Sequence, residues 1–256
     1  MLARLYFQSS LQIYKKESSG KLQFNPFAVP LSDTSLIALN QVFSNSFSFN
    51  RFSNIWGMDF NNIRNSNKAF LTYGYESRRV NEWNVKGRWN ITRSFLLELL
   101  AKKGQNKLVT PNFDNRNYNI ESYGMEPRLS FIRGTNFRIA VGYKYDDKQN
   151  TDAAQKAIIN SLTSEAKYNV LSSSSVTAKF TYSQIKYSDP GNANTPNTSV
   201  SYIMLDALLP GENFLWTVDF TKRLTSYLEL NFQYEGRKAG VSNTVHIGRA
   251  SLRALF

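Results

Sequence analysis

The sequence of 256 residues contains no cysteine and a single histidine, His246. The lack of cysteine excludes disulfides, iron–sulfur clusters and thiolate zinc sites. A histidine-dependent triad would have to use His246, yet the nearest downstream serine, Ser251, falls on the opposite face of an extended strand. The sequence also lacks a Gly-x-Ser-x-Gly elbow and a glycine-rich phosphate loop. We therefore expect no enzyme active site, no metal and no cofactor.

Long apolar runs are also missing. The longest nearly apolar stretch, 94–101, is far shorter than the roughly 20 residues that a membrane-spanning helix needs. The start of the sequence, Met1–Phe7, lacks the apolar core of a secretion signal and has the pattern of a strand. We expect the chain to be a mature protein, a truncated one or the C-terminal piece of a longer one.

The net charge is +12, from 31 Lys and Arg against 19 Asp and Glu. These basic residues are scattered singly, whereas a nucleic-acid site favours a basic block. Aromatic residues share one strand face with Leu and Val, and the basic residues occupy the other, unlike the mixed groove that binds single-stranded nucleic acid. We predict no nucleic-acid partner. Asp146, Asp147 and Asp189 lie outside any calcium-loop framework, and we expect them to be solvated loop carboxylates.

What the sequence has in abundance is a period of two. In 228–235, Leu228, Leu230, Phe232 and Tyr234 alternate with four polar residues. Such alternation predicts strands with one apolar and one wet face. The predicted strands are 3–16, 34–49, 54–64, 78–91, 94–107, 118–133, 135–147, 157–171, 174–187, 199–223, 226–237 and 243–256. Because Pro210 and Gly211 interrupt 199–223, that stretch is one kinked strand, two strands, or a strand after an ordered loop segment.

The connections between these strands alternate in length. Short links at 51–54, 92–93, 134, 172–173 and 225 alternate with long polar ones at 17–33, 65–77, 108–117, 148–156, 188–198 and 238–242. Transmembrane β-barrels have short periplasmic turns, long extracellular loops and an even number of strands. This parity favours one long kinked strand over 199–223 and places both termini in the periplasm.

The strands of roughly 10–15 residues are long for a soluble protein, in which strands average about 5–6. A soluble sandwich or barrel remains the alternative, because it also alternates apolar and polar residues. We predict one all-β domain over 1–256: an antiparallel up-and-down transmembrane β-barrel of about 12 strands in the outer membrane of a Gram-negative bacterium. It is either complete or the C-terminal part of a larger barrel, and lipid is its first partner.

Charged residues recur in mid-strand on the wet face, where a soluble core would exclude them. We expect these to face a lumen: Lys86, Arg88, Glu98, Glu126, Arg128, Arg138, Lys144, Glu165, Lys167, Lys179, Asp219 and Glu229.

The last predicted strand ends on Leu252, Ala254 and Phe256. This ending resembles the C-terminal signal that outer-membrane proteins present to the barrel assembly machinery, which implies that machinery as a partner. The segments 210–216, 234–238 and 246–249, and upstream 71–77, resemble the C-terminal barrel regions of large outer-membrane proteins of Bacteroidota. Those relatives are longer chains with N-terminal domains, so the resemblance implies a fragment. They include translocons and uptake channels.

Three functions follow as hypotheses. The first is a porin-like pore, or the wall of a translocation complex, with an anion preference because basic lumenal residues outnumber acidic ones. The second is a structural or adhesive barrel with a closed lumen. Barrels of eight strands fill with side chains and those of 16–18 leave a channel, and twelve strands lie between these cases. The third, and least favoured, is a barrel-embedded hydrolase that depends on His246.

Overall fold

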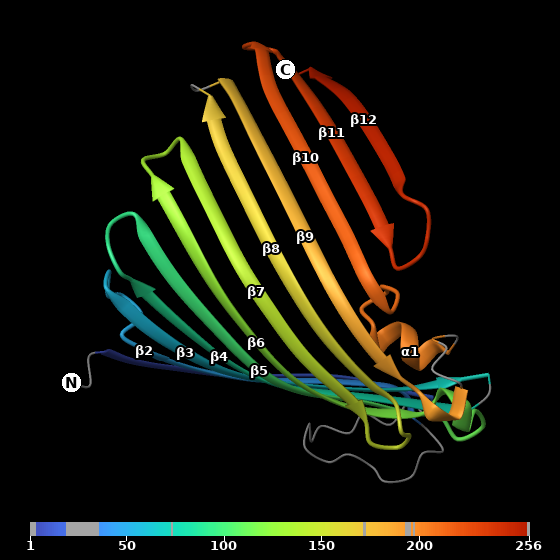
Figure 1. Ribbon diagram of the computed structural model, residues 1–256. Coiled ribbons are helices and arrows are strands. Elements are labelled where there is room, and N and C mark those ends of the chain that lie inside the picture. Colours follow the sequence, from blue (N-terminus) through green and yellow to red (C-terminus); the bar gives the residue numbers. More distant parts are fainter. Residues whose placement is uncertain are drawn as a thin grey trace.

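The structure is a computed structural model that describes residues 4–18, 36–72, 74–170, 173–192, 196 and 198–254. Within them, twelve antiparallel strands form one curved sheet whose spatial order follows the sequence (Figure 1). The strands are β1 (Leu5–Glu17), β2 (Leu36–Phe49), β3 (Trp56–Leu71), β4 (Gly74–Asn90), β5 (Phe95–Val109), β6 (Tyr118–Arg133), β7 (Phe137–Asn150), β8 (Lys156–Val170), β9 (Ser174–Ser188), β10 (Gly211–Thr225), β11 (Leu228–Ala239) and β12 (Val245–Ala254). The predicted all-β, up-and-down, twelve-stranded arrangement is confirmed.

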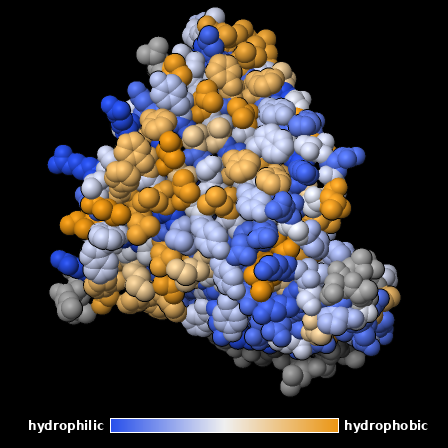
Figure 2. Space-filling model, viewed as in Figure 1, coloured by the Kyte–Doolittle hydropathy of each residue, from blue (hydrophilic) through white to orange (hydrophobic). Residues whose placement is uncertain are grey.

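The two faces of the sheet differ in chemistry because cross-strand partners share a face. On one face, Phe214 of β10 is paired with Tyr182 of β9, and Phe220 with Phe232 of β11. Many large apolar side chains on this face are more than a third exposed, among them Met125, Leu129 and Phe180. Figure 2 shows apolar and aromatic side chains gathered over the strands, with hydrophilic residues towards the end of the molecule that carries the helix. We call this face the outer face and the opposite one the inner face.

The segment 65–77, predicted as a long loop, is instead a paired hairpin. The register of β3 and β4 runs without a break from Trp56 and Trp89 to Leu71 and Gly74. The prediction was wrong because 64–68 is polar on both faces, so hydrophobic alternation stops although backbone pairing continues. Gly74 adopts φ +114°, a left-handed value that suits the tight turn.

The segment 199–223, predicted as one kinked strand, begins with a helix. Helix α1 (Ser199–Met204) lies in the long β9–β10 connection, and β10 begins only at Gly211. Thr198 caps the helix: its hydroxyl accepts a hydrogen bond from the Ser201 amide at 3.1 Å, and the Ser201 hydroxyl accepts one from the Thr198 amide. The sequence prediction missed this capping box because the apolar alternation of β10 was extended upstream over it. A strand after an ordered loop segment is therefore the correct one of the three alternatives.

The other connections keep the predicted alternation. Short links join β2 to β3, β4 to β5, β6 to β7 and β10 to β11 at one end of the sheet, and the longer ones at 110–117, 151–155, 189–210 and 240–244 lie at the other. The predicted loop 17–33 and the terminal Phe256 fall outside the described residues, apart from Glu17 and Ser18. No helix in the described ranges is long and apolar enough to cross a membrane.

The two edges of the sheet are open. Among the described residues, β1 pairs only with β2, and β12 pairs only with β11. Every residue of β12 is exposed, including Leu252 and Ala254 of the expected assembly signal. Within the described ranges, the sheet thus forms an arc whose first and last strands each have one row of backbone hydrogen-bonding groups without a strand partner.

Candidate functional site

The cross-strand register places all twelve predicted lumen-facing charges on the inner face, which is the face that carries α1. Some of them pair across strands. Lys86 Nζ lies 2.9 Å from Glu98 Oε1, and an Arg128 guanidinium nitrogen lies 3.0 Å from Glu165 Oε2. Whether this face lines a lumen stays a prediction.

Helix α1 packs on the inner face through a small apolar core. Val200 and Met204 lie four residues apart, so they share one side of the helix, and with Leu205 they are buried. Their neighbours on the wall are Leu108, Tyr118, Ile120, Ala157, Ile159 and Ile185, from β5, β6, β8 and β9. Residues 198–210 of the β9–β10 connection, which we call the α1 segment, therefore fold back over the sheet.

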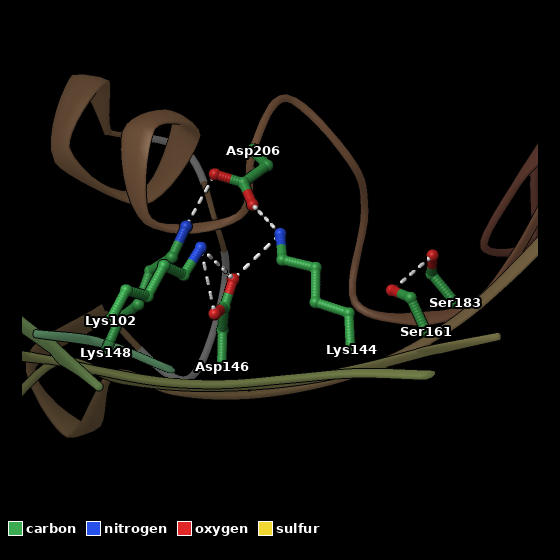
Figure 3. Close-up of polar contacts among 7 residues, drawn as sticks. All are labelled: Lys102, Lys144, Asp146, Lys148, Ser161, Ser183 and Asp206. Atoms are coloured by element: carbon green, nitrogen blue, oxygen red, sulfur yellow. Dashed lines mark hydrogen bonds and ion pairs between the residues drawn. The ribbon is translucent and has the colours of Figure 1, made fainter. Parts of the chain in front are cut away.

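A chain of charged contacts runs beside this apolar core (Figure 3). Asp146 of β7, with a side chain only 1% exposed, lies 3.1 Å from Lys102 Nζ of β5 and 2.8 Å from Lys144 Nζ. Lys144 Nζ also lies 3.4 Å from a carboxylate oxygen of Asp206, and Lys148 Nζ lies 2.5 Å from the other. Asp206 follows α1, so these contacts tie the α1 segment to the wall.

Gly124 of β6 makes the first of these contacts possible. It is paired with Lys102 on one side and with Asp146 on the other. A Cβ at this position would lie 2.2 Å from Asp146 Oδ1 and 2.4 Å from Lys102 Cε, closer than any Cβ tolerates. The missing side chain leaves the space through which Lys102 reaches across one strand to a carboxylate on the next.

The turn that carries Asp206 is strained. Asp206 and Ala207 adopt φ of 52° and 61°, left-handed values that residues with a Cβ rarely take. Three cations hold this turn: Lys144 and Lys148 contact the carboxylate, and Arg237 of β11 donates a hydrogen bond to the Ala207 carbonyl at 3.1 Å. Burial disfavours the charged carboxylate, but the hydrogen bond and charge of Lys148, followed by those of Lys144, outweigh it and lower the pKa of Asp206.

A cavity of about 390 Å³ lies between the α1 segment and the wall. Arg78, Glu82, Lys102, Ser122, Lys148 and Asp206 are among the residues that line it. Its lining mixes cations, carboxylates and neutral hydrogen-bonding groups, so it suits a small polar solute better than an apolar one. No group of three or more metal-ligating residues occurs in the part of the chain that the structure describes.

Sequence reasoning missed the centre of this site. Asp146 and Asp189 were expected to be solvated, but both are buried: Asp146 is held by two lysines, and Asp189 accepts hydrogen bonds from Tyr187 and Gln155. The alternation Lys144-x-Asp146-x-Lys148 was a usable signal, because it sets three charges on one strand face. Asp206 gave no signal, since only the fold of the α1 segment brings it to them.

His246 lies on the outer face, away from this site. Its Nδ1 is 2.8 Å from the Tyr234 hydroxyl, and the two rings stack with centroids 6.0 Å apart. Trp216 covers Gly236 between β10 and β12 and also reaches the His246 ring. Ser251, paired with Asn231, lies on the inner face, so the two residues do not converge.

No family model matches the sequence, and no curated protein matches it. Among solved structures, the sheet is similar to the siderophore receptor PirA from Acinetobacter baumannii (TM-score 0.67, 8% identity, covering 97% of this chain and 41% of that one) and to PirA from Pseudomonas aeruginosa (0.64, 11%, 98% and 40%). The ferric citrate transporter FecA gives a TM-score of 0.50 at 8% identity, covering 96% and 40%. The chain thus has the strand arrangement of an outer-membrane β-barrel and spans about two fifths of these receptors.

Proposed function

We propose that this chain forms a wall of an outer-membrane β-barrel that moves small polar solutes, with a preference for anions. The observation that carries the proposal is the contrast between the two faces: the outer face is apolar and exposed, and the inner face carries charges at mid-strand. A bilayer accommodates the first, and a water-filled passage accommodates the second.

The open edges support a wall that is completed by further strands. In hydrocarbon, unpaired backbone N–H and C=O groups cost several kcal/mol each, so both β1 and β12 require partner strands. The arc covers about two fifths of the receptors that it resembles, and it does not close within the described residues. Additional strands of the same protein or of a partner subunit would supply the missing pairing, and β12 would present the assembly signal.

Cysteine cross-linking in membranes tests this completion, and the absence of native cysteine makes it clean. Ser10→Cys combined with Ser44→Cys is the positive control, because the two hydroxyl oxygens lie 2.7 Å apart on β1 and β2. Ser10→Cys combined in turn with Arg249→Cys, Ser251→Cys or Arg253→Cys on β12 should not cross-link. Efficient β1–β12 linkage would show instead that twelve strands close on themselves.

Ion flux tests the transport role. The complete barrel, purified together with the strands that pair with β1 and β12, should conduct in planar bilayers with an anion-to-cation permeability ratio above one. The inner face predicts this sign, since its twelve mid-strand charges comprise seven basic residues and five acidic ones. Reversal of an inner-face charge, Lys179→Glu, should lower the ratio, and Lys107→Glu on the outer face should not. A complete, folded barrel without conductance would contradict the proposal.

The closed, structural barrel remains a second candidate, because the α1 segment covers part of the inner face. It predicts no conductance even when α1 is detached from the wall. The hydrolase hypothesis gains no support from the separation of His246 and Ser251. It predicts a hydrolytic activity that His246→Ala abolishes, and we expect no such activity.

A further inference from the structure

We propose that Lys144 and Lys148 form an anion-binding site on the inner face, that Asp206 occupies this site as an internal stand-in, and that a solute bearing carboxylate or phosphate groups displaces Asp206 and frees the α1 segment. This inference deepens the proposed function, on which it rests, by naming the class of solute and the element that responds to it.

The geometry of the lysines supports a site for an external anion. Both ammonium groups converge on one carboxylate, one on each oxygen (Figure 3). Asp146 already contacts Lys144 and Lys102 and is fully buried, so an incoming anion cannot replace it. Asp206 differs because 44% of its side chain is exposed, while Lys148, at 12%, is drawn towards the wall. Asp206 is therefore the exchangeable partner.

A solute has a route to Lys148, through the cavity that this residue lines. Lys148 and Asp206 both line the 390 Å³ cavity, which also presents Arg78 and Ser122. A small anion that enters the cavity can therefore reach Lys148, which contacts the same Asp206 carboxylate as Lys144 does. If the anion carries a second acidic group, Arg78, which lines the same cavity, is available to pair with it. A di- or tricarboxylate should thus compete with Asp206 better than a monovalent ion does.

The strain of the turn links anion binding to release of the α1 segment. Asp206 and Ala207 hold left-handed φ values only while the surrounding contacts impose them. When an anion takes the lysines, the carboxylate contacts disappear, and the turn keeps the Arg237 bond to the Ala207 carbonyl and its own backbone hydrogen bonds, such as that from the Ala207 amide to the Tyr202 carbonyl. The α1 segment is then held to the wall by fewer contacts, chiefly the apolar core around Val200, Met204 and Leu205, so the docked and released states come closer in free energy.

A buried alanine beneath α1 reports this release. Ala157 of β8 is 0% exposed in the core that α1 covers, so a cysteine there reacts with a membrane-impermeant maleimide only when the α1 segment moves away. The measurement uses the whole protein in isolated outer membranes. Citrate and inorganic phosphate are the probes, and sodium chloride at matched ionic strength is the control.

We expect citrate to raise the labelling rate of Ala157→Cys, and Asp206→Asn to raise it about tenfold without any probe, equivalent to about 1.4 kcal/mol. Lys148→Met should abolish the citrate response. Lys86→Met, which removes an inner-face lysine paired elsewhere, should preserve it. A citrate response matched by chloride would show general screening, and an unchanged rate in Asp206→Asn would show that the contact does not hold the segment. Either result overturns the proposal.

The labelling experiment needs no ion flux. Citrate-dependent release without conductance would disprove the transport role and retain the anion site. Conductance without citrate-dependent release would disprove the anion site and retain the transport role.

Discussion

The centre of the sheet and its two edges are built from the same alternating pattern but have different surroundings. In the centre, strands β5 to β9 have a partner on each side, and α1 covers their inner face around Ile159 and Ile185. At the edges, β1 and β12 have one partner each and are exposed along most of their length. Alternation specifies strands equally in both places. What distinguishes them is whether long connections and neighbouring strands return to cover them.

The largest effect on this difference between centre and edge is expected when a side chain of the α1 core is removed. Met204→Ala deletes most of a fully buried side chain, and such deletions cost about 2–5 kcal/mol. The α1 segment should become sensitive to proteases in intact membranes while the sheet keeps its heat-modifiable migration. Leu11→Ala on the exposed edge strand β1 is the matched control and should change neither property. Equal protection in both variants would mean that α1 is not held by its core.

The second test places the same new side chain in the centre and at the edge. Gly124→Val forces Lys102 and Asp146 apart, and overpacking of this kind costs about 1–3 kcal/mol. Gly248→Val on β12 meets nothing within 4 Å. Thermal unfolding in detergent should therefore show a lower midpoint for the first variant and an unchanged one for the second. If both midpoints fall together, the edge is more crowded than this structure shows.

The third test uses pH. Because the pKa of Asp206 is lowered in the folded state, its ionised form stabilises the docked α1 segment at every pH above the ordinary carboxyl value of about 4. This contribution is lost as pH falls through the lowered pKa. Labelling of Ala157→Cys, corrected for the pH dependence of maleimide reactivity, should stay flat from pH 8 to 5 and rise only below about pH 4. Asp206→Asn should remove that acid transition, and its persistence in this variant would assign it to another group.

The smallest effect is expected for an exposed ion pair away from α1. Lys86 and Glu98 pair on the inner face with the Lys86 side chain half exposed, and such pairs contribute about 0.2–1 kcal/mol. Glu98→Gln should lower the unfolding midpoint less than Gly124→Val does. A loss as large as that of Gly124→Val would show that the inner face is less hydrated than a polar passage requires.

Much of the fold was predictable because its determinants are local. Alternation at 228–235 and the tight links at Gly134 and Thr225 locate strands without knowledge of their neighbours. The failures come where pairing outlasts alternation, as in 65–77, or where a capping residue interrupts a strand-like run, as at Thr198. The inner-face charges followed from the same period, since each strand assigns its own faces.

The candidate site was less accessible to prediction. It joins Lys102, Asp146 and Asp206 from β5, β7 and the α1 segment, and no pattern within one strand links them. The role of Gly124 depends on the residues paired with it on the two neighbouring strands, so it can be recognised only once the register is known. The left-handed turn at Asp206 and Ala207 contains no glycine at these positions, so the sequence does not predict it.

The continuous pairing of β3 and β4 has a consequence for the shape of the membrane surface. A strand of 17 residues extends about 56 Å at roughly 3.3 Å per residue, well beyond an apolar band about 25 Å tall even at a tilt of about 40°. In the proposed membrane barrel, the polar part of this hairpin would therefore rise above the headgroups as a stiff ribbon on the side of the long connections. If that side faces outward, a macromolecule such as an antibody or a phage fibre would meet this projection as it approached the barrel.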